Sequence, residues 1–147
     1  MIFIQAIASL ALRVALALPF YQSGLTKWDG PLQLSSSTIF LFENLYKPTL
    51  FGTTYDMPFP VLAAWAASLG EILLPAALVI GFATRLSALG LLVMTGVIFS
   101  TYTALGVDPG TWQKETLPWG AMALALVAYG PGWLSFDKLI QSAWRSR

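Results

Sequence analysis

The sequence predicts an all-α membrane protein: a four-transmembrane-helix bundle with a short outer-loop helix and a C-terminal interfacial amphipathic helix. Of the 147 residues, 56% are hydrophobic and only 10% are charged, whereas a soluble domain carries about 25% charged residues. The mean hydropathy is +0.69. Four apolar segments are candidates to cross a hydrocarbon core of about 30 Å as helices. At this length we expect a single domain over residues 1–147.

The four spans are expected at about 3–26, 60–82, 86–105 and 113–130. The first contains one charge, Arg13, the second contains one, Glu71, and the third contains none. The fourth is the weakest, because its apolar part runs only from Leu117 to Tyr129 and must borrow turns from the polar residues before it. The Gly-Pro-Gly sequence at 130–132 should end it.

Two further helices are predicted outside the spans. The outer loop 27–58 contains Thr38 to Lys47, which follows a run of serines and stops at Pro48, and it should fold over the outer mouth of the bundle. Segment 135–146 places its apolar residues on one helical face behind Ser135, a candidate N-cap. This interfacial helix should lie on the inner leaflet.

The distribution of basic residues predicts the orientation. Four spans put both termini on one side, together with Arg85, Lys138, Arg145 and Arg147, while the other side has Lys27, Lys47 and Lys114. The positive-inside rule therefore predicts that both termini are cytoplasmic.

The composition excludes several kinds of chemistry. The chain has no cysteine and no histidine, so it lacks thiols, the usual haem ligand and the commonest metal ligand. We expect no metal site. Without a basic patch long enough to follow a phosphate backbone, we also expect no nucleic-acid partner.

Arg13 and Glu71 are the principal candidate site residues. They are lone charges of opposite sign, each about halfway along its span. An unpaired charge at the bilayer centre costs about 3 kcal/mol or considerably more, so we expect the two to face one another inside the bundle, directly or through a water. Such a pair could fix only how the helices pack, or it could form a ligand or proton site.

Other polar and aromatic residues extend this candidate site. Small and polar stripes on the first two spans favour close packing, and most aromatic side chains lie in the outer half, which suggests a planar or apolar ligand beneath the 38–47 helix. A helical hydroxyl taken singly is expected to bond to its own backbone. The candidate ligand-binding residues are Ser9, Phe20, Trp65, Ser68, Thr101 and Tyr102. At the outer rim, Lys27 and Glu115 are either solvated or paired across the mouth.

Three motifs resemble those of the DoxX family. They are Arg13 with Pro19-Phe20, Ser23-Gly24 and Lys27; Glu71 with Pro75 and Gly81 to Leu86; and Gly130 to Asp137. The resemblance implies a four-helix bundle in the bacterial inner membrane. It also implies a component of a membrane oxidoreductase, since relatives serve as small subunits of quinone-linked thiosulfate oxidation systems and others are associated with thiol or metal stress partners. Members commonly carry a histidine late in the third helix, where this chain has Ser100-Thr101-Tyr102.

The sequence thus predicts an accessory subunit of a membrane-bound oxidoreductase system that interacts with quinone. The alternatives are a non-catalytic structural or assembly subunit that docks onto a larger membrane complex, and a small-molecule or proton permease. The expected partners are the lipid bilayer and either a larger membrane complex or further copies of the chain. No catalytic residue is identified.

Overall fold

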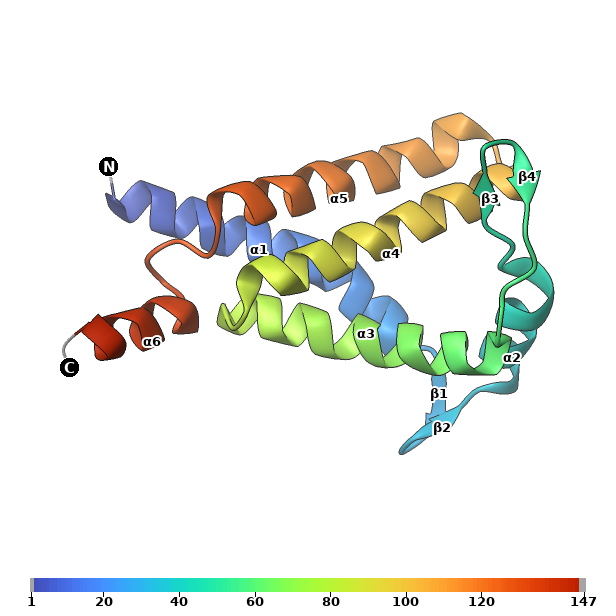
Figure 1. The fold of residues 1–147 in the computed structure, drawn as a ribbon, viewed down its shortest axis with the longest axis horizontal. Helices are drawn as coiled ribbons and strands as arrows, with labels where there is room; N and C mark the ends of the chain where they lie inside the picture. Colours follow the sequence, from blue (N-terminus) through green and yellow to red (C-terminus); the bar gives the residue numbers. More distant parts are fainter. Residues whose placement is uncertain (1, 146–147) are drawn as a thin grey trace.

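The computed structural model describes residues 2–145, apart from the side chains of residues 2, 50, 109, 112 and 145. Arg147 and the last residue of the predicted 135–146 helix lie outside this range. Four long helices run roughly along one axis (Figure 1). They are α1 (Ile2–Leu25), α3 (Pro60–Ile80), α4 (Thr84–Ala104) and α5 (Pro109–Tyr129). The last helix is α6 (Phe136–Arg145).

Three of the helices are long and apolar enough to cross a membrane, over Phe3–Leu25, Pro60–Ile80 and Thr84–Ala104. Helix α5 is equally long, at 21 residues, but its early turns include Lys114 and Glu115. The sequence placed the start of this helix at about 113, whereas the structure begins it at Pro109. The structure therefore supports an all-α membrane protein, and the fourth span stays a prediction.

The connection 27–58, which we call the outer connection after its predicted side of the membrane, with the opposite end called inner, is more structured than the sequence indicated. It contains α2 (Ser36–Phe40), continued by the π-helical η1 (Leu41–Leu45), so the predicted 38–47 helix lies two residues earlier. Two short antiparallel hairpins flank it, β1 (Trp28–Gly30) with β2 (Gln33–Leu34), and β3 (Thr49–Leu50) with β4 (Thr53–Thr54). The hairpins were not predicted, although Leu32, Phe51 and Gly52 have the positive φ values of tight turns.

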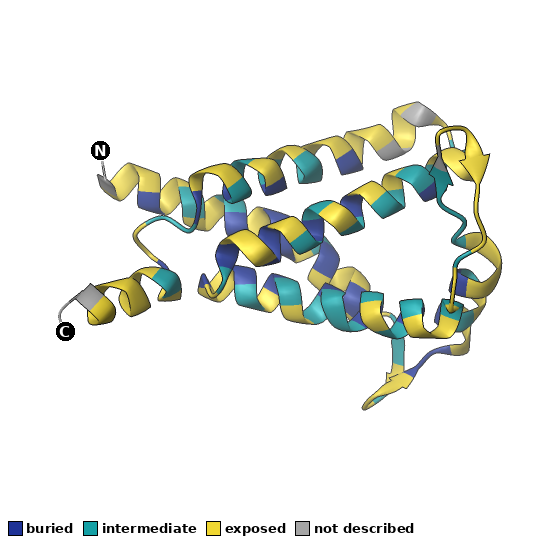
Figure 2. Ribbon diagram, viewed as in Figure 1, coloured by how far each residue is buried: buried dark blue, intermediate teal, exposed yellow. Residues whose placement is uncertain are grey.

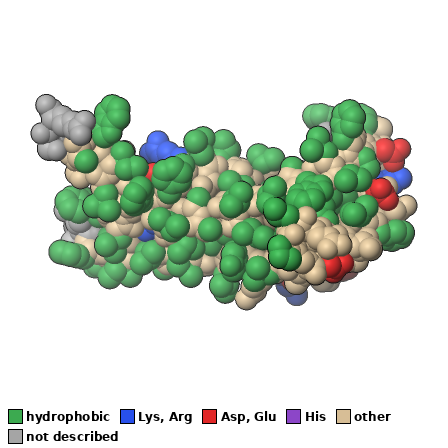
Figure 3. Space-filling model, turned by 90° about the horizontal axis from the view of Figure 1, so that it is seen from below, with side chains coloured by type: hydrophobic (Ala, Val, Ile, Leu, Met, Phe, Trp, Pro, Cys, Tyr) green, Lys and Arg blue, Asp and Glu red, His purple; other side chains and the backbone are tan. Residues whose placement is uncertain are grey.

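The core lies where the long helices face one another (Figure 2). Its buried apolar residues come from all four long helices: Leu16, Ala17, Phe20, Leu78, Ala88, Leu91, Ala123 and Leu126. A second cluster of Leu34, Phe42 and Ala64 holds the outer connection against α3. Hydrophobic side chains also cover much of the outside, and acidic side chains gather at the end formed by the outer connection (Figure 3). This surface matches a lipid environment along the helices and water at that end.

Helices α1 and α3 pack closely and run in opposite directions. A side chain at Gly24 would come within 3.0 Å of the Cβ atom of Glu71, and one at Gly81 would overlap the guanidinium of Arg13. Gly24 and Arg13 are eleven residues apart on α1, about 16 Å along the helix axis. Glu71 and Arg13 therefore lie at opposite ends of the α1–α3 interface.

Gly81 provides a test of this packing. It has φ +78°, and a Cβ atom there would lie 2.7 Å from Ser135 Cβ as well as against Arg13. Gly81→Ala should destabilise the protein by about 3 kcal/mol, because backbone strain adds to overpacking. The measurement is thermal unfolding in a mild detergent, followed by circular dichroism.

Gly52 is the matched control, since it has φ +80° with no atom within 4 Å of the added carbon. Gly52→Ala should cost only the backbone strain, about 1 kcal/mol. Equal losses of stability in the two variants would contradict the close approach at Gly81.

Candidate functional site

The structure divides the predicted charge pair between two separate polar sites. Arg13 is fully buried, and its guanidinium donates to the carbonyl oxygens of Val79, at 3.2 Å, and Leu134. Glu71 is also buried, but its Oε2 atom lies 2.7 Å from Nζ of Lys27. The expected contact between Arg13 and Glu71 is therefore wrong. The prediction placed both charges at the same depth by counting residues from the start of each span. It was wrong because α1 extends past the inner end of α3, so the two spans do not begin level.

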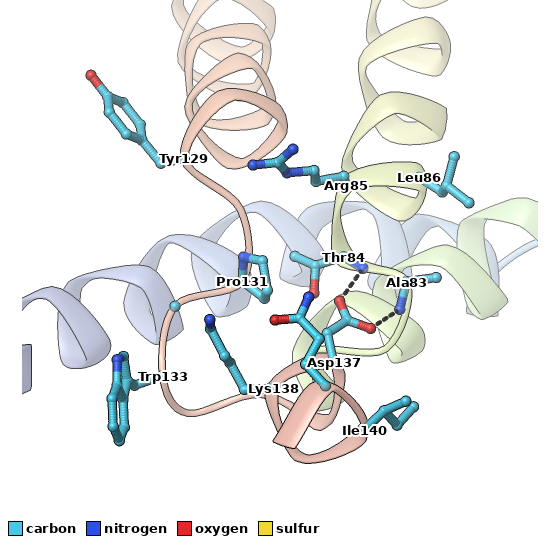
Figure 4. Close-up of a pocket in the computed structure, with 12 residues that line it drawn as sticks. Ala83, Thr84, Arg85, Leu86, Tyr129, Pro131, Trp133, Asp137, Lys138 and Ile140 are labelled. Carbon is cyan, nitrogen blue, oxygen red and sulfur yellow. Dashed lines mark hydrogen bonds between the residues drawn. The ribbon is translucent and has the colours of Figure 1, made fainter. Parts of the chain in front are cut away.

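The inner site joins the turns at the end of the bundle where the chain begins. Arg13 binds the end of α3 and the segment before α6 at once. Asp137 accepts hydrogen bonds from the amides of Ala83, at 2.8 Å, and Thr84, at 2.9 Å, and so caps α4 (Figure 4). Because carbonyl and amide groups surround both charges, this site is a structural clamp that closes the inner end.

Serine side chains complete the inner clamp. Ser9 donates to the carbonyl oxygen of Pro131 at 2.9 Å, which ties the start of α1 to the segment after α5. The side chain of Ser135 accepts from the amide of Lys138 at 3.3 Å, as expected for the N-cap of α6. Ser9, proposed from the sequence as a ligand-binding residue, thus has a partner within the protein.

The outer site is built on the Lys27–Glu71 ion pair. Lys27 follows Gly24 by three positions, so it continues the face of α1 that packs on Glu71. Its ammonium also donates to Ser23 Oγ at 3.0 Å, which leaves one of its three N–H donors without a partner in the described part of the chain. The predicted alternative pairing of Lys27 with Glu115 is wrong, and Glu115 is exposed.

A small apolar cavity adjoins Glu71 beneath η1. Its volume is about 240 Å³. The lining residues come from the outer connection, α3 and α4: Phe42, Tyr46, Met57, Ala63, Ala66, Ala67, Glu71, Val93, Met94, Val97 and Ile98. One carboxylate and one phenol are thus the ionisable groups of a mainly hydrophobic space, which is the usual character of a small-molecule site.

Aromatic side chains surround this outer site. The rings of Phe42 and Tyr46 stack with centroids 4.7 Å apart, and Trp28 meets Trp65 edge to face at 5.4 Å. Burial first, and then the nearby charges of Glu71 and Tyr102, raise the pKa of Tyr46 to about 12. Tyr46 therefore keeps its proton at neutral pH and can donate a hydrogen bond. Tyr46 was not among the site residues predicted from the sequence, although it lies in the helix that was expected to fold over the outer mouth.

Of the other residues that were predicted to bind a ligand, some lie in the hydrophobic core and others lie near the outer site. Phe20 belongs to the core and contacts Trp119, with ring centroids 5.4 Å apart. Ser68 and Thr101 are buried with hydroxyls that have no hydrogen-bond partner among the described residues. For Thr101 the expected bond to its own helix is therefore wrong. Tyr102 is half-buried and lies close enough to Tyr46 to affect its pKa.

The fold and its two polar ends define a small helical membrane protein with a clamped inner end and a polar, aromatic outer mouth. A family model described as DoxX matches residues 8–104, about two thirds of the chain, and the protein belongs to the DoxX family. The matched residues include Arg13, Lys27 and Glu71, while the resembling segment 130–137 lies beyond them.

A relative from Haemophilus influenzae aligns with nearly the whole of this chain. It is 28% identical over 152 residues, which cover 97% of this chain and 89% of the relative, and it is described as an uncharacterized protein. No solved structure matches this chain.

The ion pair can be tested by a double-mutant cycle. Lys27→Met should destabilise the protein by about 3 kcal/mol, because it leaves a buried carboxylate without its cation. Adding Glu71→Gln to Lys27→Met should recover much of this loss. Thermal unfolding in detergent is measured for Lys27→Met, for Glu71→Gln and for the double variant.

The matched control is Lys47→Met, because Lys47 pairs with the fully exposed Asp56 at 2.8 Å. This variant should unfold at the wild-type temperature. Strictly additive losses in the Lys27 and Glu71 variants would show that the two side chains do not interact.

Proposed function

We propose that this protein is an accessory subunit of a membrane-bound oxidoreductase system in the bacterial inner membrane, and that it binds a quinone headgroup in the outer cavity. The observation that carries the proposal is the apolar cavity bordered by Glu71 and roofed by Tyr46 and Phe42. A quinone ring is flat and apolar with oxygens at opposite edges. It requires hydrogen-bond donors and stacking surfaces, and both are available here.

Tyr46 is the hydrogen-bond donor that lines the cavity, and Lys27, which is not a lining residue, contacts the cavity's carboxylate, Glu71. Tyr46 stays protonated at neutral pH, and Lys27 has an N–H beyond those used by Glu71 and Ser23. The ammonium of Lys27 also holds the Glu71 carboxylate in place at the edge of the cavity, through their 2.7 Å contact. In this proposal Tyr46 donates a hydrogen bond to a carbonyl oxygen of the quinone ring, and the Lys27–Glu71 ion pair provides a polar environment at the edge of that ring.

The position of the cavity suits a lipid-soluble ligand. Its walls come from α3 and α4, two helices with membrane-spanning character. Met94, Val97 and Ile98 line the cavity and offer an apolar surface for the start of an isoprenoid tail. In this arrangement the headgroup stays at the outer mouth while the tail remains among the acyl chains.

Electron transfer itself is assigned to a partner. The chain has no histidine or cysteine, so in this proposal a larger membrane protein supplies the redox centre and this chain holds the quinone beside it. We assign both termini to the cytoplasm on the basic residues near the inner turns, which places the quinone site toward the opposite face. Helix α5 then forms the fourth span, and α6 lies at the inner surface.

Quinone binding is tested by titrating the detergent-purified protein with a short-chain ubiquinone while following tryptophan fluorescence. Trp65 and Trp28 lie beside the site and should be quenched. Tyr46→Phe and Glu71→Gln should each weaken the apparent affinity about tenfold, the effect expected from losing one hydrogen bond or charge in a dry site.

Lys47→Gln is the control, because Lys47 lies in the same outer connection but outside the cavity lining, and its affinity should match wild type. Tyr46→Phe preserves the ring and its stacking, so an unchanged affinity in this variant would refute the site. The absence of any saturable quenching by quinone in the wild type would refute the proposal as a whole.

A further inference from the structure

A second cavity, of about 630 Å³, opens at the inner end of the protein. It lies between the start of α4, the end of α5 and α6 (Figure 4). None of its residues lines the outer cavity, so what it binds is independent of the proposed quinone site. Its lining residues are Ala83, Thr84, Arg85, Leu86, Tyr129, Pro131, Gly132, Trp133, Asp137, Lys138, Ile140 and Gln141.

Two cations face this cavity from different elements. Arg85 lies in the first turn of α4 and Lys138 in the first turn of α6, and both line the cavity, with the guanidinium turned toward the end of α5 and the ammonium toward the loop at Pro131 (Figure 4). Neither has a carboxylate partner among the described residues. Within residues 2–145, the hydrogen bond of the Arg85 side chain goes to the carbonyl of Ala128, at 3.4 Å, so most of its five N–H donors have no partner in that range.

The one carboxylate of the cavity lining, Asp137, offsets only one of the two cations. Both oxygens of Asp137 are occupied by the amides of Ala83 and Thr84. The charge of Asp137 also interacts with the buried guanidinium of Arg13. The cavity therefore presents a net positive charge to a ligand, and its free donors match the oxygens of a phosphate group.

The rim of the cavity indicates that the phosphate belongs to a lipid. Tyr129 is 88% exposed, Trp133 69% and Leu86 71%. Aromatic side chains of this kind collect at the membrane–water interface, and exposed apolar groups beside the cations offer a surface for acyl chains. A free phosphate would gain nothing from them.

We propose that the inner cavity binds the phosphate of an anionic phospholipid, with Arg85 and Lys138 as its two ligands and Trp133 and Leu86 against its acyl chains. Basic pockets between helices at the cytoplasmic surface recognise headgroups of this class. Bound there, the lipid bridges α4 and α6 and joins the C-terminal helix to the bundle.

The test is a fluorescence anisotropy titration of the detergent-purified full chain with acyl-labelled phosphatidylglycerol and acyl-labelled phosphatidylcholine. Wild type should bind phosphatidylglycerol at least tenfold more tightly. The double variant Arg85→Gln/Lys138→Gln should lose this preference, so that the two lipids bind alike. Circular dichroism checks that the variant is folded, and the Arg85→Gln and Lys138→Gln single variants should each show part of the loss.

The charge-matched control is Lys47→Gln/Lys114→Gln, which removes two cations at the opposite end of the protein and should keep the wild-type preference. Equal affinity of wild type for the two lipids, or an equal loss in this control, would overturn the proposal. Inorganic phosphate should fail to displace the labelled lipid at millimolar concentration. Complete displacement would assign the cavity to a free anion instead.

Discussion

The close antiparallel packing of α1 on α3 determines where every charge inside the bundle lies. Gly24 permits contact at one end of this interface and Gly81 at the other. With the helices held in this alignment, Lys27 reaches Glu71 and Arg13 reaches the last turn of α3. In a low-dielectric interior each charge must find its partner locally, since an unpaired ion there costs several kcal/mol. The positions of the charges at both polar ends therefore follow from the packing of this one helix pair.

The two ends use their charges differently. At the inner end Arg13 is surrounded by carbonyl oxygens and Asp137 by amides, so the charges bind backbone and fix the turns. At the outer end Lys27 and Glu71 neutralise one another beside an apolar cavity. An ion pair at the edge of a cavity can exchange partners with a ligand, whereas charges bound to backbone are committed to the fold. This difference supports placing ligand binding at the outer mouth.

Much of the fold could be predicted from the sequence because hydropathy and helix length impose strong limits in a membrane. The three apolar helices, the Ser135 cap and the burial of Arg13 and Glu71 all follow from local patterns. The pairing of the charges did not follow. Counting depth from the start of each span assumes that the two helices begin level. In the structure α1 extends past the end of α3, so Arg13 and Glu71 lie about 16 Å apart along the helix axis. The hairpins were missed because their strands are only two or three residues long.

The clamp at Arg13 also has a consequence for biosynthesis. Its guanidinium takes one of its two carbonyl partners from Leu134, 121 positions later in the chain. Domains form from the N-terminus as the ribosome proceeds, so the first helix is inserted with a cation whose final acceptor has not yet been made. Until residue 134 has been made, the native hydrogen bonds of that cation are incomplete, because only the Val79 carbonyl of its two acceptors is present in the chain.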